Sequence, residues 1–314
     1  MVRRIGIVLS AGALLALACY EPPPPEEREP MWLWHNGPTA SDLYDLAGTA
    51  RDDVWAVGVD AEGAGEVLSY DGYGWGFAEL PPVKVGPLYA VDAAASGDAW
   101  AAGGGDYFLY WDGNLWRDWP HPAPGKNVYG LALLDDLNGW AVGEGGLIFK
   151  FAGGKWTALE SPTKATLRRV QVLSKKSAWA VGEGGTVLHY DGSSWREANF
   201  PPAMDLYDLR FFADDDGWVV GAVASLYRRE GSSFKRYQSP DPDITYQCCA
   251  FATSELGWAG GDEMHVARYE DGGWSLEQNM PSGNWQLAAM RMVSEEEGWA
   301  VGEGGAMMHY YRPR

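Results

Sequence analysis

The sequence predicts an all-β fold made of seven similar units, and three observations support this prediction. A tryptophan-anchored motif recurs along the chain at intervals of 39 to 45 residues. Turn glycines and short runs of β-branched and aromatic residues accompany each copy. No stretch with the apolar spacing of a helix competes with these runs. A period of this length is typical of closed or stacked repeat architectures rather than of an irregular domain.

The motif is W-A-V-G-E-G-G, and it occurs three times without change, at residues 140–146, 179–185 and 299–305. Four looser versions begin at Trp55, Trp100, Trp218 and Trp258. The chain therefore contains seven units. Each unit is one supersecondary element that needs its neighbours to bury its apolar surface.

Each unit is predicted to be a meander of four antiparallel strands. In the fourth unit the first strand carries Leu167 and Val170, which we expect on opposite faces of the strand. The motif beginning at Trp179 forms the second strand, residues 186–190 form the third, and Trp195 opens the fourth after an Asp-Gly turn. Both faces of such a sheet are apolar, so we expect it to pack between two others.

Radial repetition of such sheets around an axis predicts a seven-bladed β-propeller with four antiparallel strands in each blade. The seventh unit ends after its third strand. Trp32 lies eleven residues before Leu43, just as Trp195 lies eleven before Leu206. The N-terminal strand is therefore expected to complete the last blade.

The N-terminal region has the pattern of an export signal. Residues 1–18 combine a basic start with a short apolar run, and L-A-L-A-C before the cleavage point resembles the lipobox of bacterial lipoproteins. We expect lipidation of Cys19, a proline- and glutamate-rich tether over 19–30, and the propeller over 31–314. The alternative is an ordinary secretory signal with a chance cysteine. Either reading predicts export; the lipoprotein reading adds an anchor at the bacterial envelope, in the periplasm or at the outer membrane and cell surface.

The chain is strongly acidic, with a formal net charge of −19. Nucleic acid is an unsuitable partner because its backbone needs a basic face. The same charge disfavours adsorption to anionic lipid, so membrane association should depend on the acyl group.

The repeat G-W-A-V-G-E-G-G, followed by a β-branched strand, Asp-Gly and Trp, resembles that of the photosystem II stability/assembly factor family and of the broader Asp-box (BNR-like) propellers. The resemblance covers nearly all of 31–314 and implies a seven-bladed propeller that binds protein during assembly of a membrane complex, without catalysis. The family's arginine-rich binding surface has no residue-by-residue match here. The repeat is also similar to the tectonin repeat of sugar-binding propellers, which implies a lectin as the alternative.

Basic residues gather in the fourth unit of an otherwise acidic protein. If the first strand lines the axial channel, Arg168 and Arg169 lie near its mouth, where with Lys175 and Lys176 they could bind a carboxylate or an acidic peptide. The alternative is that they pair with acids of adjacent blades, such as Asp208.

Three tryptophans lie outside the two regular positions of the repeat and are candidates for a sugar-stacking or protein-contact surface: Trp111, Trp119 and Trp285. The neighbouring pair Cys248 and Cys249 either closes a vicinal disulfide or provides two buried reduced thiols.

Acidic residues recur in the turn of the motif, where they form either a ring that attracts a cation or a basic partner, or ordinary solvated turns. They are Glu144, Glu183, Asp262 and Glu303. No metal-ligand spacing and no nucleophile motif is present, so we expect no metal, no cofactor and no enzyme activity. A degenerate sialidase-like glycosidase is the weakest alternative, because such a site needs an arginine triad and the arginines of this sequence cluster in one unit.

Together these observations predict a monomeric, non-catalytic, exported lipoprotein. We expect it to serve as a protein-binding or assembly scaffold for an envelope protein or complex, with a glycan as the alternative ligand.

Overall fold

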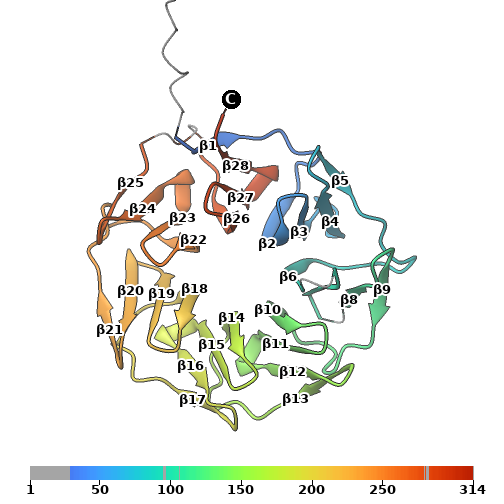
Figure 1. Cartoon of the computed structure of the whole chain (residues 1–314). Coiled ribbons are helices and arrows are strands. Elements are labelled where there is room, and N and C mark those ends of the chain that lie inside the picture. The colour runs from blue at the N-terminus through green and yellow to red at the C-terminus, as the bar shows by residue number, and fades with distance from the viewer. Residues whose placement is uncertain (1–28, 95–96, 106, 279, 281–282, 314) are drawn as a thin grey trace, which may run out of the picture.

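Seven four-stranded antiparallel sheets stand like blades around a central axis (Figure 1). The computed structural model describes residues 29–94, 97–105, 107–278, 280 and 283–313. The prediction of an all-β, seven-bladed propeller is confirmed. The first strand of each blade lies nearest the axis and the fourth lies at the rim.

The first four blades contain β2 (Asp42–Ala50), β3 (Asp53–Val59), β4 (Gly65–Tyr70) and β5 (Trp75–Phe77); β6 (Leu88–Ala93), β7 (Ala99–Gly103), β8 (Phe108–Trp111) and β9 (Trp116–Trp119); β10 (Val128–Asp135), β11 (Asn138–Gly143), β12 (Ile148–Ala152) and β13 (Lys155–Ala158); and β14 (Leu167–Ser174), β15 (Ser177–Gly182), β16 (Val187–Tyr190) and β17 (Trp195–Glu197). The last three contain β18 (Leu206–Ala213), β19 (Asp216–Gly221), β20 (Ser225–Glu230) and β21 (Ser233–Arg236); β22 (Tyr246–Thr253), β23 (Leu256–Gly261), β24 (Val266–Glu270) and β25 (Gly273–Leu276); and β26 (Leu287–Ser294), β27 (Glu297–Gly302), β28 (Met307–Tyr311) and β1 (Met31–Trp34). Four short 3₁₀ turns join second to third strands: η1 (Glu144–Gly146), η2 (Glu183–Gly185), η3 (Asp262–Met264) and η4 (Glu303–Gly305).

The ring is closed by the N-terminal strand, as predicted. β1 pairs antiparallel with β28, and Trp32 lies opposite Tyr310. β1 thus supplies the outermost strand of the seventh blade, so strands from the two ends of the described chain lie side by side (Figure 1).

Edge-to-face aromatic pairs connect every blade to the next. Each anchor tryptophan packs against the aromatic residue that opens the fourth strand of the following blade. Trp140 and Trp195, for example, have ring centroids 5.0 Å apart at an angle of 85°. Trp32 takes the same role for Trp258, at 6.0 Å and 87°. Such pairs add about 0.5–1.5 kcal/mol each beyond the burial of their surface. This interlock explains why the repeat needs both aromatic positions.

The innermost strand of every blade contains a β-bulge near its start. In β14 the register shifts between Leu167 and Arg169, which leaves Arg168 without a partner on β15. The bulge adds one residue, so Leu167 and Val170 pack into the same interblade cluster. Our expectation that they lie on opposite faces is wrong, because simple alternation does not count the extra residue.

The bulge also explains the last residue of W-A-V-G. The strand that carries the motif must pass close to the bulged backbone of its neighbour. A Cβ atom at Gly182 would lie 2.1 Å from the carbonyl oxygen of Thr166, although the backbone of Gly182 is extended. The equivalent glycines of the other six blades would meet a carbonyl oxygen at 1.8–2.3 Å. Glycine is therefore required here for close approach rather than for a positive φ.

The predicted signal peptide (1–18), the lipidation site Cys19 and all but the end of the tether (19–30) lie outside the described residues. Within the part that the structure describes, no helix has the length and apolar character needed to cross a membrane.

Candidate functional site

A cavity of about 220 Å³ occupies the axis of the propeller and is lined by the first strands of all seven blades. The side chains that face it form two layers. The outer layer is formed at the position ten residues before the anchor tryptophan of each blade, and the inner layer at the position eight residues before it. The two layers therefore lie about 7 Å apart along the strands. Of the residues at these positions, Asp45, Arg169 and Asp208 line the cavity in the outer layer, and Asp92, Ala132, Gln171, Arg210, Ala250 and Arg291 line it in the inner layer.

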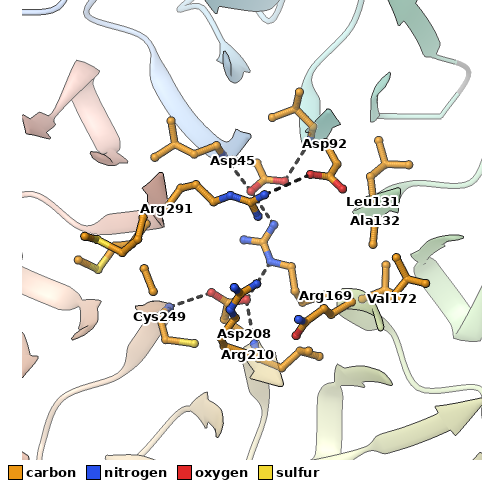
Figure 2. A pocket seen from close by; sticks show the side chains of 18 of the residues that line it. Asp45, Asp92, Leu131, Ala132, Arg169, Val172, Asp208, Arg210, Cys249 and Arg291 are labelled. Atoms are coloured by element: carbon orange, nitrogen blue, oxygen red, sulfur yellow. Dashed lines mark hydrogen bonds and ion pairs between the residues drawn. The ribbon is translucent and has the colours of Figure 1, made fainter. Parts of the chain in front are cut away.

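In the outer layer Arg169 is held by two carboxylates. Its Nη1 lies 2.7 Å from Oδ1 of Asp45, and its Nε lies 3.2 Å from Oδ1 of Asp208. β2 and β14 are three blades apart in the ring, so the contact with Asp45 crosses the channel (Figure 2). Burial alone would lower the pKa of Arg169, but the two carboxylates outweigh it and raise that pKa. Arg169 is thus engaged inside the fold.

The cavity acids also tie neighbouring blades together. Asp45 accepts a hydrogen bond from the backbone N–H of Val91 on the next blade at 3.0 Å, and Asp208 accepts one from Cys249 at 2.8 Å. In the inner layer Asp92 accepts from Leu133 at 2.7 Å. The inner edge of each first strand has no strand partner, so these side chains satisfy N–H groups that would otherwise be buried without a partner.

Two guanidinium groups of the inner layer are much less fully paired. Arg291 has an Asp92 oxygen 3.9 Å from its Nη2 and a 3.4 Å hydrogen bond to the carbonyl oxygen of Gly48. Among the described residues, Arg210 has neither a hydrogen bond nor an ion pair from its side chain. Burial, reinforced by the positive charge of Arg291, lowers the pKa of Arg210.

The view that the arginines cluster in one blade is therefore wrong for the folded protein. Arg169, Arg210 and Arg291 come from the fourth, fifth and seventh blades and converge on the cavity (Figure 2). Sequence analysis missed Arg210 and Arg291, although both stand eight residues before their anchor tryptophan and an alignment of the seven repeats would have matched them. Among the described residues that line the cavity there is no tyrosine and no glutamate, the pair expected of a sialidase-like site.

Aromatic side chains lie along part of one mouth of the channel. The bulged residue of each first strand lies beside the η turns, on what we call the turn face. Tyr44, Tyr89, Tyr129 and Tyr207 occupy this position in four blades, and we call them the tyrosine arc. Neighbouring rings lie 5.4 Å apart between Tyr44 and Tyr89 and again between Tyr89 and Tyr129. All four are partly exposed, and burial raises the pKa values of Tyr44, Tyr89 and Tyr207.

Arg168 continues the arc in the fourth blade. Its guanidinium lies over the ring of Tyr129, 5.0 Å from the centroid, and its Nη2 donates to Glu183 at 2.7 Å. About a third of its side chain is exposed. Unlike Arg169, Arg168 therefore lies at a surface that a partner can reach. The acidic residues of the four motif turns lie on this same face.

The structure does not bring all four candidate basic residues together. Arg168 stands at the start of β14, whereas Lys175 and Lys176 follow its end and lie on the opposite face of the propeller. Lys175 is exposed, with its Nζ 4.0 Å from a carboxylate oxygen of Asp135. The basic cluster predicted from the sequence is thus divided. Arg168 lies on the turn face, Arg169 lies in the cavity, and Lys175 and Lys176 lie on the opposite face.

The three candidate tryptophans differ in their surroundings. Trp111 packs against Trp55 of the preceding blade at 5.0 Å, and Trp119 packs against Trp100 of its own blade at 5.1 Å, and both are partly buried. Trp285 remains 38% exposed and lies 5.1 Å from Trp34. Met264 of η3 donates its backbone N–H to the carbonyl oxygen of Trp285, which puts this tryptophan on the turn face.

Cys248 and Cys249 are free, buried thiols. Cys248 packs in the cluster that contains Trp258, whereas Cys249 packs in the cluster that contains Trp218, on the other side of β22. Burial raises the pKa of both thiols. The side chains of Cys248 and Cys249 thus point to opposite sides of β22, which favours two separately packed thiols.

The fold and these surfaces define a seven-bladed β-propeller with a charged axial cavity and an aromatic turn face. The chain is similar to a photosystem II stability/assembly factor: over 133 residues it is 28% identical to HCF136 of Arabidopsis thaliana chloroplasts, a match that covers 41% of this chain and 32% of that protein. It thus spans about a third of the length of this curated relative. No protein-family model matches the chain.

Solved structures agree with this fold. YCF48 bound to a D1 peptide superposes with a TM-score of 0.75 at 18% identity, over 93% of this chain and all of that one. YCF48 from Cyanidioschyzon merolae gives 0.74 at 18% identity, over 89% and 98% of the two chains. A streptogramin B lyase gives 0.77 at 16% identity, over 90% and 98%. Likeness at this identity extends to the fold alone.

Proposed function

We propose that this protein is a non-catalytic scaffold that binds a partner polypeptide on its turn face. The observation that carries the proposal is the tyrosine arc, a run of partly exposed aromatic rings around a channel mouth. Tyrosines are favoured at protein interfaces because they offer a large contact area and a polar tip. The similarity to an assembly factor and the peptide bound to YCF48 support a polypeptide as the ligand.

The charges around the arc indicate the chemistry of the partner. Glu144, Glu183, Asp262 and Glu303 lie in the turns beside it, and Glu183 is already paired with Arg168. A partner segment that carries lysine or arginine would complement these acids and could also stack on the tyrosine rings. We therefore propose a basic segment of an envelope protein as the ligand.

Crosslinking and mass spectrometry on native membranes test this function. We expect a discrete partner to crosslink to the turn face of the wild-type protein. The double variant Tyr44→Ala/Tyr129→Ala should lose that partner, whereas Tyr73→Ala should keep it, because Tyr73 is 97% exposed in the β4–β5 turn, away from the arc. Equal recovery by the double variant would show that the arc is not the docking surface.

A carbohydrate is the second candidate ligand, and one observation favours it. Trp34 and Trp285 form an exposed pair, 40% and 38% accessible, whose rings lie 5.1 Å apart on the turn face. Exposed aromatic rings are suitable platforms for a sugar ring. Binding on a glycan array that free sugar abolishes, and that Trp285→Ala removes, would support a lectin instead of a protein scaffold.

We further propose that the propeller is exported and held at the bacterial envelope by lipid on Cys19. The support is the lipobox-like L-A-L-A-C and the tether that follows it. Because β1 is the outermost strand of its blade, an anchor ahead of it would hold the propeller by its rim and leave both faces accessible. Cys19→Ala should move the protein from the membrane fraction to the soluble fraction, and unchanged fractionation would contradict the proposal.

A further inference from the structure

The inner layer of the axial cavity contains two cations for which the fold supplies incomplete counter-charge. Arg210 and Arg291 occupy the same position on β18 and β26, and the blade between them has only the methyl group of Ala250 there. Their mutual repulsion is part of why the pKa of Arg210 is lowered. Two guanidinium groups that line one cavity, repel each other and are partly out of water are costly unless an anion neutralises them.

The acids of the cavity are already occupied. Asp45 and Asp208 each contact Arg169 and each accept two backbone N–H groups. One oxygen of Asp92 accepts from Leu133, and the other lies 3.9 Å from Arg291, beyond hydrogen-bonding distance. The three aspartates therefore leave the donors of Arg210 and most of those of Arg291 available.

We propose that the axial cavity binds one small oxyanion, a carboxylate or a phosphate, between Arg210 and Arg291. The planar donor fork of arginine matches two oxygens of either group. The cavity of about 220 Å³ corresponds to roughly seven water volumes of ~30 Å³ each, so an anion of a few heavy atoms fits together with bridging water. This inference does not depend on the proposed partner on the turn face.

The outer layer determines from which face of the propeller an anion can reach this site. The Asp45–Arg169–Asp208 bridge crosses the channel on the side of the turn face, about 7 Å from the inner layer. The anion therefore enters from the opposite face. Acidic turns such as 214–216 and 295–297 surround that entrance and repel anions at low ionic strength.

Titration calorimetry at pH 7 in 150 mM NaCl tests the proposal, with sodium phosphate and sodium succinate as separate probes. We expect one site per chain for at least one probe. Each of Arg210→Gln and Arg291→Gln should weaken binding about tenfold or more, and the double variant should abolish it. Arg196→Gln is the matched control, because the Arg196 side chain is 70% exposed on β17. Phosphate binding alone assigns a phosphoryl ligand, and succinate binding alone assigns a carboxylate.

The proposal fails if neither probe binds the wild-type protein, or if the double variant binds as tightly as the wild type. Circular dichroism checks that each variant is folded. If the glutamine variants do not fold, Arg210→Lys keeps the charge but loses the fork, and should still bind several-fold more weakly. The thermal midpoint of the wild type should also rise with probe concentration at constant ionic strength, as expected for a ligand that binds only the folded state. A midpoint that follows ionic strength alone counts against the site.

Discussion

The Arg169 guanidinium of the fourth blade lies 2.7 Å from the Asp45 carboxylate of the first, across the axis of the propeller. Only 16% of the Arg169 side chain and 6% of the Asp45 side chain are exposed. The contact therefore joins blades that are not neighbours, and it makes the centre of the ring part of the folding unit rather than an open channel.

Removing Arg169 should destabilise the protein. Arg169→Ala would leave Asp45 and Asp208 without their counter-charge, and breaking a buried pair in this way costs about 3 kcal/mol or more. Urea denaturation should show a lower midpoint for this variant and no measurable change for Arg196→Ala. Unchanged stability combined with loss of a partner would instead make Arg169 a binding residue.

The closing strand should be essential, unlike the segment before it. A chain that begins at Glu29 keeps β1, whereas one that begins at Pro38 removes it and exposes the surface that Trp32 covers. Trp32→Ala alone should cost about 3–5 kcal/mol, because this indole is 1% exposed between Trp258 and Tyr310. Thermal unfolding followed by tryptophan fluorescence measures both effects. A chain begun at Pro38 that unfolds like the longer one would refute closure by β1.

The glycine that ends W-A-V-G should not tolerate a methyl group. Gly182→Ala would push Cβ into the carbonyl oxygen of Thr166, so we expect a loss of about 1–3 kcal/mol. Gly76→Ala on β5 is the matched control, since its Cβ would meet nothing within 4 Å. Equilibrium unfolding of the two variants should differ clearly, and equal stability would contradict the close approach at the bulge.

The stability of the seventh blade should depend on pH through His309. Its ring stacks on Trp299 at 3.9 Å, and its Nε2 lies 3.2 Å from Oε1 of Glu297. Burial, assisted by His35 and Arg51, lowers the pKa of His309 to about 4 from 6.5. The unfolded chain therefore binds a proton first as the pH falls, and stability is lost between about pH 6.5 and pH 4.

We expect this loss to be about 2 kcal/mol between pH 7 and pH 4.5, measured by denaturant titration at each pH. His309→Gln should flatten the dependence over that range. A wild-type slope in the His309 variant would mean that other groups, such as Glu297, cause the dependence.

The number of blades, the four strands of each and the closing role of Trp32 could be predicted from the sequence. These features depend on short-range patterns: a fixed spacing between two aromatic positions, turn glycines, and apolar strands that repeat every 39 to 45 residues. The edge-to-face pairing of Trp32 with Trp258 follows the same spacing as the other blades, so the repeat itself contained that information.

The sites were decided by the tertiary structure. The bulge before Arg169 changes which side chains share a face, and a one-residue insertion in a strand has no distinct sequence signal. Arg169, Arg210 and Arg291 are far apart in the chain, and only closure of the ring brings them to one cavity. Local sequence pattern therefore determined the structure of each blade. The assembly of seven blades around one axis determined which charged side chains meet, because the distance between those side chains is set by the closed ring and not by any single segment of the chain.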